Sequence, residues 1–274
     1  MNSSQDFFPP LLQKNIRRLS ALTEVCYKPR EEWTCPVVHV RKLAKLSEKI
    51  ALPLLCGRSK GRLKCPPELT ILLIHTYADT PIMEKSLHYV GIDDFVVRKP
   101  VLDRPWSSNV KLMELMNFLD SDSCKTEYVL YCDSDDAVLR DDPAKAIRYL
   151  EEEDCDLLMS NTNFQGAYEC MPEVRQWALQ NAREHNSPPQ FINAGVFIGR
   201  APFLREVIAA SLEYVTDSDL HREEYWQYCE DGTLRDRLPD FPRGIGSDQV
   251  VLRYLHPRFY PRMKVDYKGR LALR

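Results

Sequence analysis

The chain has 274 residues, of which 44% are hydrophobic, so it can bury one large core or a core with an appendage. Its formal net charge of −3 gives no reason to expect nucleic acid or an anionic membrane surface as a partner. The longest apolar runs, such as residues 70–75, are too short to span a bilayer, and the first ten residues do not resemble a secretory signal. The nine cysteines are an odd number, and several lie in apolar runs, which predicts buried free thiols and a cytoplasmic location.

Residues 1–68 differ in pattern from the rest of the chain. Their apolar residues recur at helical spacing in two runs, the second of which we expect Pro53 to close: Leu11, Leu12, Ile16, Leu19 and Leu22, then Val40, Leu43, Leu46 and Ile50. Basic residues then alternate with small ones over residues 56–65, before Pro66 and Pro67. The pattern predicts a helical N-terminal extension with a basic loop over 1–68, followed by a second domain over 69–274.

From residue 69 onward, strand and helix patterns alternate along the chain. The predicted strands are 70–77, 94–98, 127–132, 155–160, 191–199 and 263–267. The predicted helices are 81–91, 109–120, 142–153, 172–185, 201–215 and 247–256. Such alternation implies right-handed crossovers and an α/β fold, with a mixed, mostly parallel sheet that helices cover on both faces.

An acidic cluster, Asp133-Ser134-Asp135-Asp136, directly follows the apolar run 128–132. Three carboxylates at the end of a buried strand repel one another, and a hard cation such as Mg²⁺ or Mn²⁺ would remove the repulsion. Open α/β sheets bind their ligands at the carboxyl ends of strands, so the cluster indicates a metal-bridged phosphate site. An acidic turn explains the same residues equally well.

Two further segments suit the recognition of a ligand. Thr76, Tyr77 and Asp79 follow the first sheet strand, where an aromatic ring with polar neighbours could stack on a base, or where Asp79 could simply cap a helix. Asn193 and Gly195 interrupt an apolar strand. Glycine there indicates a close approach to the backbone, and the amide suits sugar hydroxyls, although a bulge with a satisfied amide is the alternative.

A third segment, residues 244–249, ends a loop and begins a helix at Ser247. Asp248 and Gln249 could be ordinary first-turn residues, or they could hold a hexose together with Asn193. In their order and spacing these segments, with the acidic cluster and the closing residues 264–271, resemble the glycosyltransferase domain of procollagen lysyl hydroxylases and, more broadly, GT-A glycosyltransferases. The resemblance covers about residues 69–271.

The resemblance implies a ligand set and a cofactor. Mn²⁺ or Mg²⁺ would be held by Asp133 with Asp135 or Asp136 and would bridge the diphosphate of a UDP-sugar, with Ser134 in the same site. Lys111 would contact phosphate, although a solvent-facing lysine is an open alternative. Asn193, Gly195, Asp248 and Gln249 would face the sugar. The family has a further metal-ligating histidine after the last strand, whereas the last histidine here, His256, lies in a predicted helix. Asp266 could substitute for it.

The sequence therefore predicts a metal-dependent glycosyltransferase that moves a hexose from a nucleotide sugar, with UDP as the expected carrier, to a hydroxyl acceptor. Asp248 is the candidate base of an inverting reaction, and Asn193 and Gln249 would fix the hexose. Two alternatives stay open. One is a GT-A-like binding protein that has lost activity, and the other is an aspartyl-phosphate phosphatase, whose nucleophile also follows a strand. The acceptor, the stereochemical outcome and the oligomeric state are left open.

Overall fold

The computed structural model describes residues 35–39, 48–102, 106, 108–165, 168, 171–214 and 247–273. All of them belong to one compact unit that extends from Cys35 to Leu273. The sequence places a boundary after residue 68, whereas the described residues before that point pack in the same unit as the rest. The helical run predicted over 11–22 lies outside the described residues.

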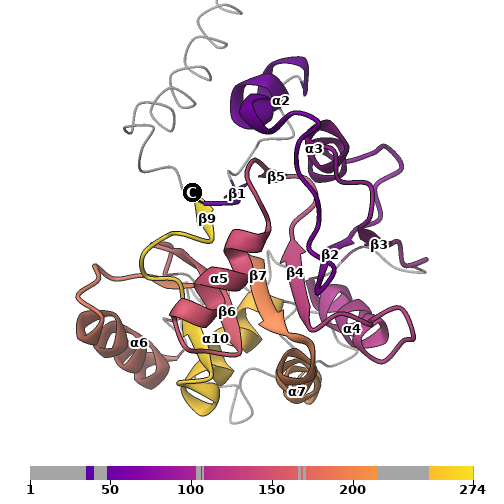
Figure 1. Cartoon of the computed structure of the whole chain (residues 1–274). Coiled ribbons are helices and arrows are strands. Elements are labelled where there is room, and N and C mark those ends of the chain that lie inside the picture. The colour runs from indigo at the N-terminus through magenta and orange to yellow at the C-terminus, as the bar shows by residue number, and fades with distance from the viewer. Residues whose placement is uncertain are drawn as a thin grey trace, which may run out of the picture. The chain divides into compact units, whose positions relative to one another are not determined.

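A six-stranded sheet forms the centre of this unit, in the order β3-β2-β4-β7-β6-β8 (Figure 1). Its strands are β2 (Leu69–Ile74), β3 (Val96–Arg98), β4 (Tyr128–Cys132), β6 (Leu157–Thr162), β7 (Phe191–Arg200) and β8 (Met263–Val265). Neighbouring strands are parallel except where β7 pairs with β4 and β6. This mixed, mostly parallel sheet, flanked by helices, confirms the predicted α/β fold class.

Alternate residues of the buried strands feed two cores, one on each face of the sheet. On β4, for example, Leu130 joins the first core and Val129 the second. The first core is covered by α2 (Glu48–Cys56), α3 (Ile82–Val90) and α5 (Ala144–Glu152), and the second by α4 (Ser108–Leu119), α7 (Ala201–Leu212) and α10 (Asp248–Phe259) (Figure 1). Helix α6 (Pro172–Glu184) packs against α10.

A second, three-stranded sheet has the order β5-β1-β9. Its strands are β1 (Val37–His39), β5 (Ala137–Leu139) and β9 (Ala272–Leu273). Strand β1 pairs antiparallel with β5 and parallel with β9. Sequence patterns do not predict these strands because two or three residues are too few to show a period. The small sheet brings residues 37–39 beside the loop that carries the acidic cluster.

Among the described helices some ends follow local sequence signals, while α2 and α10 each continue past a proline. Gly91 ends α3 in the left-handed region, with φ of 100°, which glycine adopts without steric cost. Pro53, in contrast, lies inside α2, so the predicted end there is wrong. The helix continues because Leu55 and Cys56 still add buried apolar surface to the first core. Among the described helices, none is both long and apolar enough to cross a membrane.

Candidate metal centre

The acidic cluster lies at the carboxyl end of β4, in the loop that leads to β5. The amide of Asp133 donates a hydrogen bond of 2.7 Å to the carbonyl of Gly195, so β7 fixes the first residue of the loop. Because β2 and β4 are parallel, the loop after β2 opens at the same edge of the sheet. Three segments of the predicted site therefore meet at one edge.

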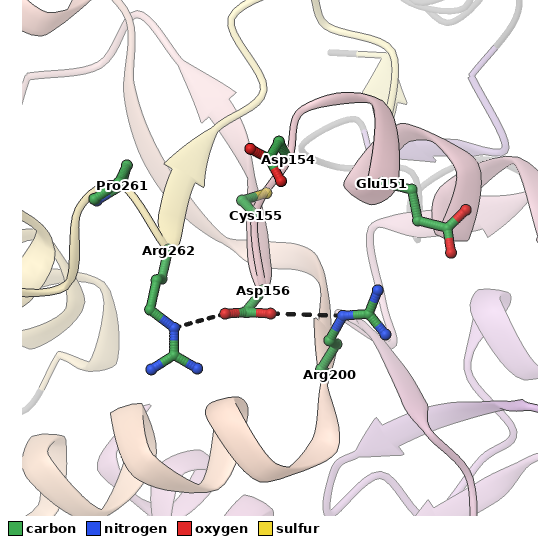
Figure 2. Close-up of a pocket in the computed structure, with 7 residues that line it drawn as sticks. All are labelled: Glu151, Asp154, Cys155, Asp156, Arg200, Pro261 and Arg262. Atoms are coloured by element: carbon green, nitrogen blue, oxygen red, sulfur yellow. Dashed lines mark hydrogen bonds and ion pairs between the residues drawn. The ribbon is translucent and has the colours of Figure 1, made fainter.

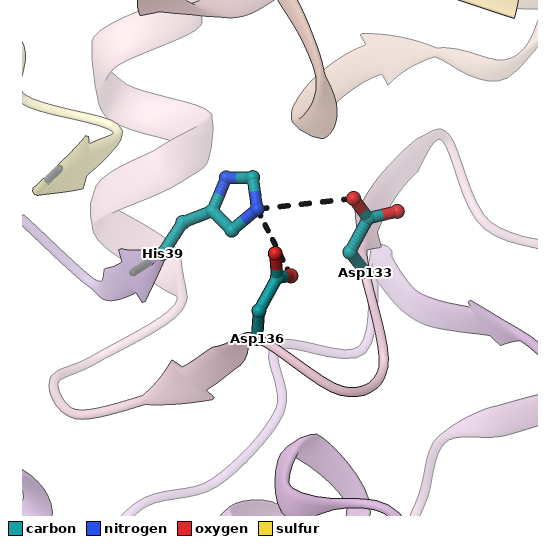
Figure 3. Close-up of side chains that lie close together, drawn as sticks. All are labelled: His39, Asp133 and Asp136. Carbon is teal, nitrogen blue, oxygen red and sulfur yellow. Dashed lines mark ion pairs between the residues drawn. The ribbon is translucent and has the colours of Figure 1, made fainter. Parts of the chain in front are cut away.

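Three side chains converge there: His39 from β1 and Asp133 and Asp136 from the acidic loop (Figure 3). One ligand atom of each lies within 4.8 Å of the others. His39 Nε2 is 3.0 Å from Asp136 Oδ1 and 3.8 Å from Asp133 Oδ2. His39 is buried, with 2% of its surface exposed, while both carboxylates are partly open.

The contact between His39 and Asp136 has the geometry of two ligands aimed at one ion. Asp136 Oδ1 is buried and accepts no hydrogen bond, although His39 Nε2 lies 3.0 Å away. Adjacent ligands of an octahedral Mg²⁺ ion, with bonds of about 2.1 Å, lie about 3 Å apart. One imidazole and two carboxylates therefore fit a hard divalent cation such as Mn²⁺ or Mg²⁺.

The other oxygen of Asp133 is occupied, which orients the carboxylate. Asp133 Oδ1 accepts hydrogen bonds from the Tyr131 hydroxyl at 3.0 Å and from Lys111 Nζ at 3.3 Å. Its Oδ2 is thereby turned toward His39. Hydrogen bonds to the ligands of a metal tune its affinity, so Tyr131 and Lys111 belong to the candidate centre.

Gly195 lies directly beneath this centre. A Cβ at position 195 would overlap His39 Cε1 and would lie 2.6 Å from Asp133 Oδ2. The close approach that the sequence predicts at Gly195 is thus made by two ligands of the candidate centre. Glycine is needed here for space, since its φ is not in the left-handed region.

Lys111 is buried between two carboxylates instead of facing solvent. Its Nζ is 3.3 Å from Asp133 and 2.6 Å from Asp248, and it donates to the carbonyl of Ala194 at 3.2 Å. Burial alone would lower the pKa of Lys111, but the two carboxylates outweigh it and raise the pKa. Burial raises the pKa of Asp248, and the Lys111 charge opposes that effect. The ion pair between Lys111 and Asp248 brings α4 and the start of α10 together at the edge of the sheet that carries the acidic loop.

The amides of Asn193 and Gln249 form one network. Asn193 Nδ2 donates to Gln249 Oε1 at 3.1 Å, and Asn193 Oδ1 accepts from Ser160 Oγ and from the amide of Gly195, each at 3.1 Å. Beside this network, the pairing of β6 with β7 shifts register between Met159 and Ser160. The structure therefore contains the satisfied amide and the bulge of the alternative interpretation, and it brings Asn193, Gln249 and Asp248 together.

The loop after β2 is fixed by His75. Its Nδ1 accepts from the amide of Tyr77 at 3.2 Å, so its Nε2 carries the proton and donates to Glu84 at 2.6 Å. The rings of His75 and Tyr77 stack with centroids 5.5 Å apart, and Tyr77 is 45% exposed. Thr76 and Asp79 are exposed in the same loop.

The loop after β2 also reaches the acidic cluster. Burial and the nearby Asp135 carboxylate, which hydrogen-bonds the phenol, raise the pKa of Tyr77 to about 12. Burial and the charge of Asp136 raise the pKa of Asp135. Asp135 thus faces Tyr77, and the convergent triad uses the Asp-x-x-Asp spacing. Ser134 is buried, and its carbonyl accepts from the amide of Met83.

Asp266 has a different environment. Its Oδ2 accepts a hydrogen bond of 2.5 Å from the amide of Leu271, just before β9, and it is not in the convergent triad. A histidine that could take the place of the one expected after the last strand comes instead from His39. The sequence does not predict it, because His39 lies in the part expected to form a separate N-terminal extension. The signal was present, since Val37, Val38 and His39 repeat the pattern of a short apolar run followed by a ligating side chain.

A recess of about 360 Å³ lies at the opposite edge of the sheet, around the starts of β6 and β8 and the end of β7 (Figure 2). Asp156 occupies its centre and pairs with Arg262 at 2.6 Å and Arg200 at 3.5 Å. Arg200 also pairs with Glu127, and Arg262 with Glu206. These opposite charges are paired with one another. The ion pairs of Asp156 link the start of β6 to the end of β7 and to the start of β8, which gives the recess a structural role.

No family model matches the chain, and no curated protein matches it. Among solved structures it is similar to a glycosyltransferase involved in the glycosylation of the major capsid of PBCV-1. The two are 17% identical, the match covers 73% of this chain and 81% of the other, and the TM-score is 0.39. The function proposed below stands on the geometry of the site.

Proposed function

We propose that this protein is a metal-dependent glycosyltransferase that moves a hexose from a nucleotide sugar, with UDP as the expected carrier, to a hydroxyl acceptor. The observation that carries the proposal is the convergence of His39, Asp133 and Asp136 at the sheet edge where Asn193 and Asp248 also lie. A cation site with sugar-binding groups beside it suits a diphosphate joined to a hexose.

In this proposal His39, Asp133 and Asp136 would hold Mn²⁺ or Mg²⁺, and the bound ion would supply Lewis-acid stabilisation of negative charge on a diphosphate. Lys111 would place a positive charge 3.3 Å from Asp133 and 2.6 Å from Asp248, beside the diphosphate position. Asn193 and Gln249 would fix the hexose hydroxyls.

The remaining predicted groups have roles at the two ends of the donor. Tyr77, with Thr76 and Asp79, would contact the base, because its half-exposed ring lies in a loop that hydrogen bonds to His75 hold in place. Asp248 is the candidate base of an inverting path. It would need to act beside the Lys111 ammonium, 2.6 Å away. A retaining path has no need of such a base.

The phosphatase alternative fits the geometry less well. A nucleophilic aspartate needs an oxygen that can reach phosphorus. Asp133 Oδ1 accepts two hydrogen bonds, and Oδ2 faces His39 above Gly195. The environment of Asp133 is that of a metal ligand more than of a nucleophile.

The test is the double variant Asp133→Asn with Asp136→Asn, compared with a double variant in the exposed pair Asp93→Asn with Asp94→Asn, which removes the same charge. We expect the first pair to abolish both Mn²⁺ binding, measured by calorimetry, and hydrolysis across a panel of UDP-sugars, while the second pair leaves both intact.

Other outcomes would redirect the assignment. Turnover like that of the wild type in the first double variant would overturn the metal site. Binding of UDP and Mn²⁺ by the wild type without hydrolysis or transfer would identify a binding protein. A phosphate-like adduct with beryllofluoride at Asp133 would favour the phosphatase.

A further inference from the structure

The first turn of α3 holds two loops of the candidate site at once. The amide of Met83 donates to the carbonyl of Ser134, in the acidic loop, at 3.0 Å. The next residue, Glu84, accepts from His75, in the loop after β2, at 2.6 Å. Consecutive residues of one helix therefore fix both the acidic loop and the loop in which a base would bind.

His75 is held in one orientation by its neighbours. Its backbone amide donates to the carbonyl of Arg98 at 3.1 Å, and its Nδ1 accepts from the amide of Tyr77 at 3.2 Å. His75 and Glu84 are both buried, and burial lowers the pKa of His75, so the ring is neutral at neutral pH. The Glu84 carboxylate selects the tautomer with the proton on Nε2, which leaves a lone pair on Nδ1 for the Tyr77 amide.

Tyr77 is thereby presented as a fixed aromatic surface. One face of its ring stacks on His75, with centroids 5.5 Å apart and 24° between the ring planes, and its hydroxyl hydrogen-bonds the Asp135 carboxylate. Tyr77 is 45% exposed although one face and the hydroxyl are occupied, so its exposed surface includes the opposite face of the ring. A ring that is already held loses little conformational freedom when a planar ligand stacks on it.

We propose that His75 and Glu84 are positioning residues that hold Tyr77 as a stacking platform for the base of the nucleotide sugar. The inference rests on the proposed function, because the nucleotide sugar is what brings a base to this loop. Glu84 orients His75, and His75 orients Tyr77, which alone stacks on the base. Because Met83 holds Ser134 from the same turn, α3 also sets the position of this platform relative to the candidate metal centre.

A positioning role predicts a selective effect of substitutions at Glu84. Uridine carries a base but no phosphate, whereas pyrophosphate with Mn²⁺ carries no base, so the two ligands report on the platform and on the candidate metal centre separately. A change that only disturbs the orientation of Tyr77 should weaken uridine binding and leave pyrophosphate binding unchanged. A general loss of structure should weaken both.

The test titrates each ligand by calorimetry, with a thermal melt of every variant. Glu84→Met keeps the volume of the side chain but removes the acceptor, whereas Glu84→Gln keeps an oxygen that can accept from His75. Tyr77→Ala removes the platform. Asp93→Ala is the matched control, because Asp93 makes a carboxylate contact of the same length, 2.6 Å, with the exposed His88 on α3.

We expect Tyr77→Ala to weaken uridine binding by at least about 5-fold, as the loss of base stacking typically does. Glu84→Met should weaken it several-fold, while Glu84→Gln and Asp93→Ala behave as wild type. Binding of pyrophosphate with Mn²⁺ should be the same in the wild type and in both Glu84 variants.

Several outcomes would overturn the positioning role: no uridine binding by the wild type, uridine binding like that of the wild type in Glu84→Met or in the exposed-site variant Tyr77→Ala, or a parallel loss of uridine and pyrophosphate binding in Glu84→Met. UDP-sugar hydrolysis by the wild type is measured alongside. If hydrolysis is absent while the uridine pattern holds, the proposed transferase function fails and the base platform stands. If hydrolysis occurs without that pattern, only the positioning role fails.

Discussion

At the scale of single residues, His39 would add a nitrogen ligand to a cluster that otherwise offers carboxylate oxygens. Mg²⁺ accepts an all-oxygen site readily, whereas imidazole suits transition metals better. If the set His39, Asp133 and Asp136 binds a cation, we expect it to prefer Mn²⁺ to Mg²⁺, and the loss of His39 should show this most clearly.

We expect His39→Ala to weaken Mn²⁺ binding by at least about 10-fold, since removal of groups that orient or form a metal site typically costs 10- to 100-fold. The decrease for Mg²⁺ should be smaller. Calorimetric titration with each metal measures both. His88→Ala is the control, because His88 is exposed and pairs with Asp93 elsewhere. Unchanged affinity for both metals in His39→Ala would show that His39 is not a ligand.

A substitution at Gly195 would test the same centre through steric overlap, without removing any candidate ligand. Gly195→Ala should displace His39 and Asp133, because the new methyl group would occupy the position of the imidazole edge. We expect Mn²⁺ binding and UDP-sugar hydrolysis to be lost together while the far-ultraviolet circular dichroism spectrum is retained. Gly57→Ala, where a Cβ meets nothing within 4 Å, should behave as wild type. Normal metal binding in Gly195→Ala would place the ion elsewhere.

At the scale of elements, the three-stranded sheet determines where His39 points. Strand β1 lies between β5, which immediately follows the acidic loop, and β9, near the end of the described chain. The carboxylate of Asp266 holds the turn before β9 by accepting from the amide of Leu271. We therefore expect Asp266 to act on the candidate centre through β9 and β1, as a positioning residue.

Two substitutions of Asp266 separate this role from direct ligation. Asp266→Asn keeps an oxygen that can accept from Leu271, so Mn²⁺ affinity should change by no more than a few-fold. Asp266→Ala removes the acceptor, and both Mn²⁺ affinity and the midpoint of thermal unfolding should fall. Calorimetry and a thermal melt measure the two quantities. Loss of Mn²⁺ binding in Asp266→Asn, with an unchanged melt, would instead identify the carboxylate as a ligand.

At the scale of the whole molecule, stability should depend on pH through a group remote from the candidate centre. His256 is buried in α10 with its ring against Trp177, and burial lowers its pKa to about 4 from the usual 6.5. Between these values the unfolded chain binds a proton that the folded chain does not. Stability is therefore lost as pH falls from 6.5 toward 4, by about 3 kcal/mol at most.

Urea unfolding at pH 7 and at pH 4.5 measures this loss. We expect His256→Phe, which keeps a ring against Trp177, to lose about 2 kcal/mol less than the wild type between the two pH values. Burial raises the pKa of Asp248 and Asp266, and these groups act in the opposite direction in both proteins. The difference between variant and wild type isolates His256. An identical decrease in both would mean that His256 does not contribute.

The sequence by itself determined the order of the main strands and helices, because the helices show a period, the strands lie in apolar runs, and some elements end at a recognisable signal, such as Gly91. It also singled out Asp133, Asp135 and Asp136 together, since carboxylates after a buried run stand out locally, but it did not choose between Asp135 and Asp136. Tertiary structure alone decided that His39 joins them, because the three-residue strand β1 finds its partners about 100 and 235 residues further along the chain. Pairings so distant leave no local pattern, and neither does the packing that buries Lys111 between Asp133 and Asp248.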